Sequence, residues 1–128
     1  MKRGGAAVYW RWLPAFLLFA LPAPAAAMNV HEFLAKIAAL EKMGMRAMFS
    51  KDVGLLKTEL ETAGKSLKAE NDSAIAAGKP SSYCPPKKVK MTPKELVGHF
   101  RAIPPGQRAM SVRDGLHLIM RREYPCPR

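Results

Sequence analysis

From about residue 29 to residue 124, apolar side chains recur at steps of three and four positions, the spacing of an amphipathic α-helix. No segment of useful length alternates apolar and polar residues as a half-buried β-strand does. Proline and glycine interrupt the pattern, so the chain cannot form one long helix. The pattern therefore predicts an all-α fold, a small bundle or orthogonal array of about four helices with short connections.

The N-terminus of each expected helix is marked by a residue whose side-chain oxygen can cap it. These residues are Asn29, Ser50, Thr92 and Ser111. The start at Thr92 has the most complete set of signals, because Pro93 occupies the first helical position and Glu95 completes a capping box. Gly44 suits the end of the first helix, because glycine adopts a positive φ at little cost. Residues 45–49 then form a short apolar connection to the second helix.

The second helix is the longest one expected, from about Lys51 to Ala77. Its apolar stripe is formed by Val53, Leu56, Leu60, Ala63, Leu67 and Ala74. Gly64 and the polar run 71–73 weaken the pattern, so the sequence leaves open whether this helix is continuous or broken. Residues 79–91 follow as a loop, because two consecutive prolines forbid regular helix there.

Residues 1–27 have the organisation of a secretory signal peptide. Two basic residues supply a positive start, and an apolar run follows over residues 13–21. Ala25 and Ala27 then form the small-residue pattern that signal peptidase accepts, which predicts cleavage after Ala27.

A membrane anchor is the alternative interpretation of the same segment. The apolar run of about nine residues is too short for this, because a spanning helix needs about 20. We therefore expect residues 28–128 to form a single helical domain in the periplasm or outside the cell. No stable insertion into a membrane is expected once the signal peptide is removed.

The chain has two cysteines, Cys84 and Cys126. Export would place them in an oxidising compartment, where a pair of thiols normally forms a disulfide. Closing a loop of about 40 residues restricts the unfolded chain and stabilises the fold by about 4 kcal/mol on the chain-entropy account. The alternative is a reactive or metal-binding thiol, which the absence of a Cys-x-x-Cys pair or a neighbouring histidine disfavours.

The chain is basic. Residues 1–27 hold three of the basic residues and no acidic one, so residues 28–128 keep a net charge of +8 out of +11. Basic clusters lie at Lys87, Lys88 and Lys90 and at Arg121 and Arg122. They form either a solubilising surface or a patch for an acidic partner or an anionic surface of the cell envelope. Export and the lack of alternating aromatic and basic residues argue against nucleic acid as a partner.

No motif for catalysis or for metal binding is recognisable. His31, His99 and His117 are not arranged as a metal-binding motif, and no two of them lie four positions apart. No serine has the setting of an activated nucleophile, and no glycine-rich phosphate loop is present. We therefore expect a protein that is not an enzyme, with no catalytic residues, no metal site and no cofactor.

Three methionines, Met43, Met45 and Met48, gather where the first helix meets the second. Such methionines usually fill irregular gaps in a core, because the side chain is unbranched and adaptable. The alternative is an exposed surface that contacts a partner.

Residues 83–127 show a specific order of features. Tyr83-Cys84-Pro85-Pro86 comes first, followed by the capped helix of residues 92–100 and a connection with prolines and arginine over residues 103–108. The last helix closes in Tyr124-Pro125-Cys126-Pro127. This order resembles the C-terminal halves of the Rap/Tai family of small periplasmic immunity proteins. The first half departs from the family, because residues 55–77 contain neither the cysteine nor the aromatic residues common there.

The resemblance implies an all-α fold with a disulfide, often assembled as a homodimer. Family members bind a cell-wall amidase toxin delivered by type VI secretion and obstruct its active cleft in the periplasm. The function expected here is therefore that of an exported immunity or inhibitor protein. The alternative is a basic, envelope-associated helical module that binds anionic surfaces without a toxin partner.

Gln107 and Arg108 are the residues that we select as candidates for partner binding, because they lie in the connection of this C-terminal half. The alternative for Arg108 is a charge that packs across the junction between the two helices.

Overall fold

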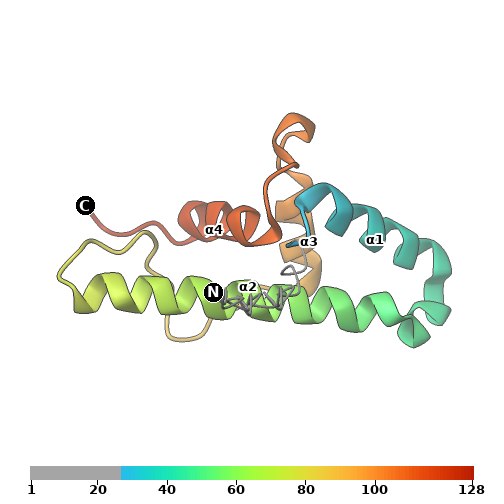
Figure 1. The fold of residues 1–128 in the computed structure, drawn as a ribbon, viewed down its shortest axis with the longest axis horizontal. Coiled ribbons are helices and arrows are strands. Elements are labelled where there is room, and N and C mark those ends of the chain that lie inside the picture. Colours follow the sequence, from blue (N-terminus) through green and yellow to red (C-terminus); the bar gives the residue numbers. More distant parts are fainter. Residues whose placement is uncertain (1–26) are drawn as a thin grey trace, which may run out of the picture.

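The structure is a computed structural model that describes residues 27–128. The predicted signal peptide lies outside the described residues, apart from Ala27. The described part is all-α, as expected, and contains four α-helices and two short 3₁₀ turns (Figure 1). In chain order these are α1 (Val30–Met43), η1 (Gly44–Phe49), α2 (Lys51–Ala76), α3 (Pro93–Arg101), η2 (Pro105–Gln107) and α4 (Val112–Glu123).

All four predicted N-terminal caps are present. The side chains of Asn29, Ser50 and Ser111 accept hydrogen bonds from the backbone N–H groups of their own first turns. Thr92 and Glu95 form the complete capping box at α3, with the Glu95 carboxylate accepting from the Thr92 N–H at 2.7 Å. Gly44 ends α1 with a φ of 57°, as expected from glycine's tolerance of positive φ.

The segment that the sequence left open, residues 51–77, contains one continuous helix, α2, of 26 residues. Gly64 and Asn71 both lie inside it. Packing explains the continuity: Leu56, Ala63 and Leu67 are buried along one face, and α2 packs along α4. Tertiary packing thus outweighs the weak helical propensity of these positions.

The centre of the core lies where α1, α3 and α4 meet. Phe33 of α1 and Phe100 of α3 are fully buried, with ring centroids 4.9 Å apart. Gly115 of α4 adjoins them. A Cβ atom at position 115 would lie 2.8 Å from Val30 Cγ2 and 3.0 Å from Phe100 Cε1. Glycine therefore permits α4 to approach the other two helices this closely.

The residues before α1 are tied to the start of α4. Asn29 and Ser111 form an isolated antiparallel bridge. The Val112 N–H donates to the Met28 carbonyl at 2.9 Å, and the Val30 N–H donates to the Met110 carbonyl at the same distance. Met28 itself is only 8% exposed. The residue directly after the predicted cleavage site is therefore part of the packed domain.

Candidate functional site

A disulfide between Cys84 and Cys126 closes the C-terminal half of the chain, which confirms the predicted pairing. The two Cα atoms are 4.8 Å apart, and the Cys84 N–H donates to the Tyr124 carbonyl at 2.8 Å. The loop before α3 is thus joined to the segment after α4 by one covalent bond and one backbone hydrogen bond. We call residues 83–127 the closed module.

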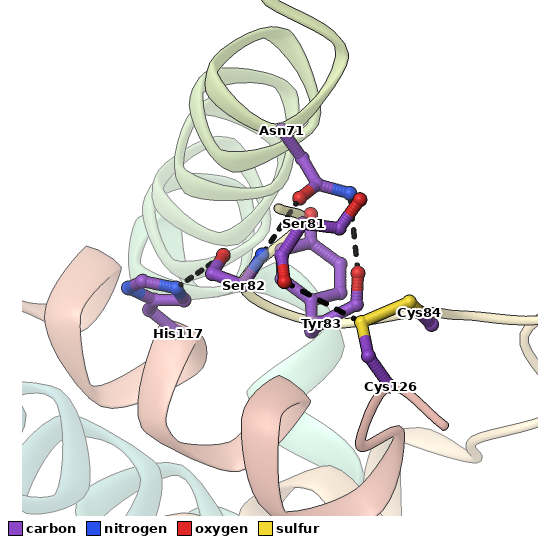
Figure 2. Close-up of a disulfide and its surroundings, with 7 residues drawn as sticks. All are labelled: Asn71, Ser81, Ser82, Tyr83, Cys84, His117 and Cys126. Carbon is purple, nitrogen blue, oxygen red and sulfur yellow. Dashed lines mark hydrogen bonds between the residues drawn. A yellow bond between two sulfur atoms is a disulfide. The ribbon is translucent and has the colours of Figure 1, made fainter. Parts of the chain in front are cut away.

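Asn71 attaches the closed module to α2 (Figure 2). Its Nδ2 donates to the Tyr83 carbonyl at 3.2 Å, and its Oδ1 accepts from the Ser82 N–H at 3.3 Å. The side chain is buried and both of its polar atoms are satisfied, so it holds the loop instead of weakening its own helix. Sequence reasoning missed this role. The signal was present, because Asn71 follows Ala63 and Leu67 at successive steps of four, as a polar residue in an apolar stripe.

Tyr83 is the aromatic anchor of this attachment and is 5% exposed. Its ring meets the His117 ring edge-on, with centroids 6.0 Å apart. Burial raises the pKa of the Tyr83 phenol above its ordinary value, and the Asp72 and Glu70 carboxylates raise it further. The phenol therefore stays neutral at physiological pH.

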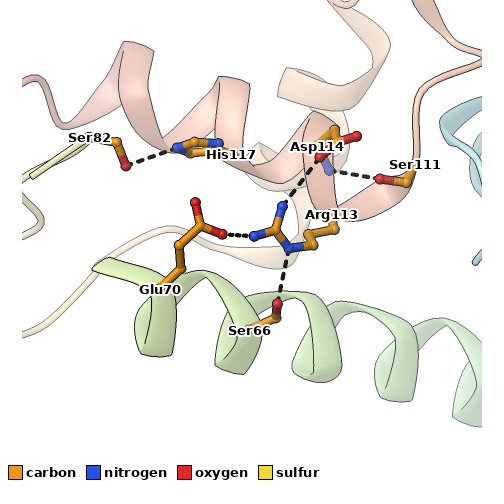
Figure 3. A network of polar contacts seen from close by, with 7 residues as sticks. All are labelled: Ser66, Glu70, Ser82, Ser111, Arg113, Asp114 and His117. Atoms are coloured by element: carbon orange, nitrogen blue, oxygen red, sulfur yellow. Dashed lines mark hydrogen bonds and ion pairs between the residues drawn. The ribbon is translucent and has the colours of Figure 1, made fainter. Parts of the chain in front are cut away.

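The three histidines lie in different settings. His117 Nε2 is 2.9 Å from Ser82 Oγ, which joins α4 to the loop (Figures 2 and 3). His99 Nδ1 lies 3.5 Å from Glu123 Oε1, between α3 and the end of α4. His31 is exposed in the first turn of α1. Within residues 27–128, no group of three or more His, Cys, Asp or Glu side chains is close enough to hold a metal ion.

Arg113 forms a direct polar connection between α4 and α2 (Figure 3). Its guanidinium donates to Ser66 Oγ at 3.0 Å and pairs with the carboxylate of Glu70. Asp114 contacts the same guanidinium at 3.4 Å. The C-terminal half of α2 is thus joined to α4 by apolar packing and by two separate polar contacts.

The two residues predicted to bind a partner lie in the connection between α3 and α4. This connection projects away from the other helices (Figure 1). Gln107 is exposed at the end of η2. Arg108 is half-buried, and its guanidinium donates to the carbonyls of Ile103 at 2.9 Å and Arg101 at 2.8 Å. Arg108 therefore packs across the junction and satisfies carbonyls at the end of α3, and the role of both residues in partner binding stays a prediction.

An open pocket of about 290 Å³ lies between the end of α1 and α3. Pro93, Lys94 and Val97 line it, together with the ion pair between Arg101 and Glu41, whose charged atoms are 2.7 Å apart. The ion pair occupies two of the three charged side chains in the lining, and Lys94 is the third.

The methionine-rich segment between α1 and α2 has a different character. Met45 is 83% exposed, Met48 is 76% exposed and Phe49 is 91% exposed. Met43 is 44% exposed. The interpretation of the three methionines as residues that fill gaps in the core is therefore wrong, and the contact with a partner stays a prediction. The physical reason is that η1 turns outward at the end of the molecule opposite the C-terminus, where α1 gives way to α2 (Figure 1).

In the part of the chain that the structure describes, no helix has the length and apolar character needed to cross a membrane. Comparisons of the chain with models of known protein families, with curated proteins and with solved structures found no match.

Proposed function

We propose that this protein is an exported inhibitor that binds and blocks a peptidoglycan amidase toxin, in the manner of the immunity proteins that its C-terminal half resembles. The observation that carries the proposal is the closed module. The disulfide joins the two cysteines of the resemblance, and between them lie the capped helix, the connection and the last helix in the same order.

The geometry of the module supports binding by shape. The connection between α3 and α4 projects from the helices, and Arg108 holds its base by bonding to two carbonyls near the end of α3. A projecting loop with a fixed base loses little conformational freedom on binding, which favours affinity. Gln107, exposed on this loop, is the residue that we propose contacts the toxin.

The disulfide also supports the proposed location. Stable disulfides belong to oxidising compartments such as the periplasm and the extracellular space. This agrees with the signal peptide predicted for residues 1–27. The protein acts there by occupying the cleft of its partner and carries out no reaction of its own.

The test is an affinity pull-down from periplasmic extract with the processed, oxidised protein, washed first at low and then at high salt. An amidase retained at high salt, and inhibited by the added protein in a peptidoglycan-cleavage assay, is the expected result. Heterogeneous anionic material released by salt, with no amidase, would overturn the proposal in favour of a basic module that binds the envelope surface.

A matched pair of variants locates the contact. We expect Gln107→Glu to weaken amidase inhibition, because it places a negative charge on the projecting loop. Lys65→Glu, on an exposed position of α2, should leave inhibition unchanged. Light scattering of the same preparation checks the homodimer that the resemblance implies.

A further inference from the structure

The exposed segment between α1 and α2 combines apolar and cationic side chains. We call it the apolar corner and define it by Met45, Met48 and Phe49 together with Lys42, Arg46 and Lys51. The three apolar side chains are among the most exposed large hydrophobic residues of the described chain. Single exposed apolar residues are ordinary on a protein surface, but three within five positions of a projecting turn indicate an interaction surface.

The charged members of the corner are all basic. Lys42, Arg46 and Lys51 form none of the ion pairs found within residues 27–128. The acidic residues that flank the segment are already paired, Glu41 with Arg101 and Asp52 with Lys36. The corner therefore presents uncompensated positive charge beside exposed apolar side chains.

The shape of the corner limits its occupants. It is a convex turn of six residues at one end of the molecule, where α1 passes into α2 (Figure 1). A second copy placed symmetrically on it would bring the same three cations face to face, and such like-charge contacts oppose association. The complementary occupant is an anionic surface that accepts apolar side chains from a convex projection.

We propose that the apolar corner docks reversibly onto a bilayer that carries anionic phospholipid. Met45, Met48 and Phe49 enter the boundary between headgroups and acyl chains, and Lys42, Arg46 and Lys51 lie at the level of the phosphates. Apolar side chains flanked by cations are the arrangement that holds a peripheral protein at such an interface. The unbranched methionines suit this disordered boundary, because they adapt their shape to it.

This docking goes beyond the proposed inhibition and uses a different part of the molecule. The corner lies between α1 and α2, whereas the closed module contributes α3, α4 and their connection. Docking through the corner would leave Gln107 free to contact a toxin. The two proposals can therefore fail separately.

The test is co-sedimentation of the processed protein with phosphatidylcholine vesicles and with vesicles of equal parts phosphatidylcholine and phosphatidylglycerol. Binding is expected to the anionic vesicles alone and to fall as salt is raised. We expect Phe49→Gln to lower the partition coefficient about tenfold. Replacing Lys42, Arg46 and Lys51 together by Gln should lower it about a hundredfold or more.

Two control variants test whether the corner is specific. Ile75→Gln removes another exposed apolar side chain, at the far end of α2, and should leave vesicle binding unchanged. Replacing Lys87, Lys88 and Lys90 together by Gln removes an equal number of cations from the loop and should have a much smaller effect than the corner variant. Equal losses in corner and control variants would overturn the proposal, as would failure of the unaltered protein to bind anionic vesicles.

A spectroscopic reporter gives an independent readout. Both tryptophans of the chain, Trp10 and Trp12, lie in the predicted signal peptide, so Phe49→Trp places a single tryptophan in the processed protein. Its emission should shift to shorter wavelength on addition of the anionic vesicles. A shift that depends on protein concentration and needs no vesicles would assign the corner to a second copy, and a shift that needs an added protein would assign it to a protein partner. Either result would overturn the proposal.

Discussion

The two ends of α2 are held in opposite ways. At the C-terminal end, Asn71 bonds to the loop, Glu70 pairs with Arg113, and the disulfide lies nearby (Figures 2 and 3). At the N-terminal end, Phe49 precedes the helix almost fully exposed, and the apolar side chains around it pack against little. The same helix therefore connects a region whose contacts stabilise the fold with a region whose exposed side chains contribute little to stability.

The largest difference in stability is expected between substitutions of two phenylalanines, one buried in the core and one exposed at the apolar corner. Phe100→Ala removes a fully buried ring that packs against the ring of Phe33, and should lower the free energy of unfolding by about 3–5 kcal/mol. Phe49→Ala removes an exposed ring and should change it by less than about 0.5 kcal/mol. Urea denaturation of both variants measures the contrast. Similar losses in the two would mean that the corner is packed in solution.

The disulfide gives the next largest effect. Replacing Cys84 and Cys126 together by Ser should lower the free energy of unfolding by about 2–4 kcal/mol, because the unfolded chain regains the freedom that the closed loop removes. Mass spectrometry should find two hydrogens missing from the native protein and no alkylation before reduction. Two free thiols in freshly exported protein would contradict the pairing.

Two glycines sharpen the comparison between packed and open positions. Gly115→Ala places a methyl group against Val30 and Phe100 and should destabilise the protein by about 1–3 kcal/mol. Gly54→Ala, in the first turns of α2, meets no atom within 4 Å and should instead stabilise it by about 0.4–1 kcal/mol. Thermal melting should show a lower melting temperature for Gly115→Ala and a higher one for Gly54→Ala than for the unaltered protein. Equal signs would contradict the close approach of α4.

Loss of the cap of α3 should lower the stability of the protein more than loss of the cap of α2. Thr92→Ala removes the reciprocal capping box of α3 and should cost about 1 kcal/mol. Ser50→Ala removes one longer bond, from the Asp52 N–H to Ser50 Oγ at 3.3 Å, next to the exposed corner, and should cost less. Denaturant midpoints of the two variants make the comparison, and a larger loss from Ser50→Ala would contradict it.

The smallest expected effect is a dependence on pH. The Thr92 backbone N–H and hydroxyl donate to the Glu95 carboxylate and hold its pKa below the ordinary value of 4.5. The stability contributed by this contact is fully present above pH 4.5 and is lost as the pH falls through the lower pKa of the folded state. Glu95→Gln should flatten this part of the stability profile, whereas Glu59→Gln, outside the box, should leave it unchanged. An unaltered slope in Glu95→Gln would contradict the assignment.

The sequence predicted the features whose partners lie close along the chain. The four caps join residues two or three positions apart, and Gly44 acts on the helix that it ends. The disulfide is the long-range feature that was also predicted, because the chain has two cysteines and therefore one possible intramolecular pair. For each of these features the sequence offers few other possible partners.

The candidate site was predicted less completely, because its residues depend on which elements meet. Asn71 looked unfavourable for a helix until Ser82 and Tyr83 were found beside it. For Arg108 the sequence left two roles open, and the structure shows the one across the junction, in which the carbonyls of Ile103 and Arg101 accept its hydrogen bonds. The groups that bond to Asn71 lie 11 and 12 positions along the chain, and those that bond to Arg108 lie five and seven positions back, across a turn of the backbone. In both cases the role of the side chain depends on how the chain folds back on itself.

The amino-acid sequence by itself therefore determined the all-α class, the helix starts and the single disulfide, since short-range hydrogen bonds, periodicity and a unique cysteine pair specify them. Only the tertiary structure decided that α2 is continuous, that Gly115 lies against Val30, and that Met45, Met48 and Phe49 are exposed. The physical reason is that burial belongs to the arrangement of whole helices. An apolar residue looks the same in the sequence whether or not another helix covers it.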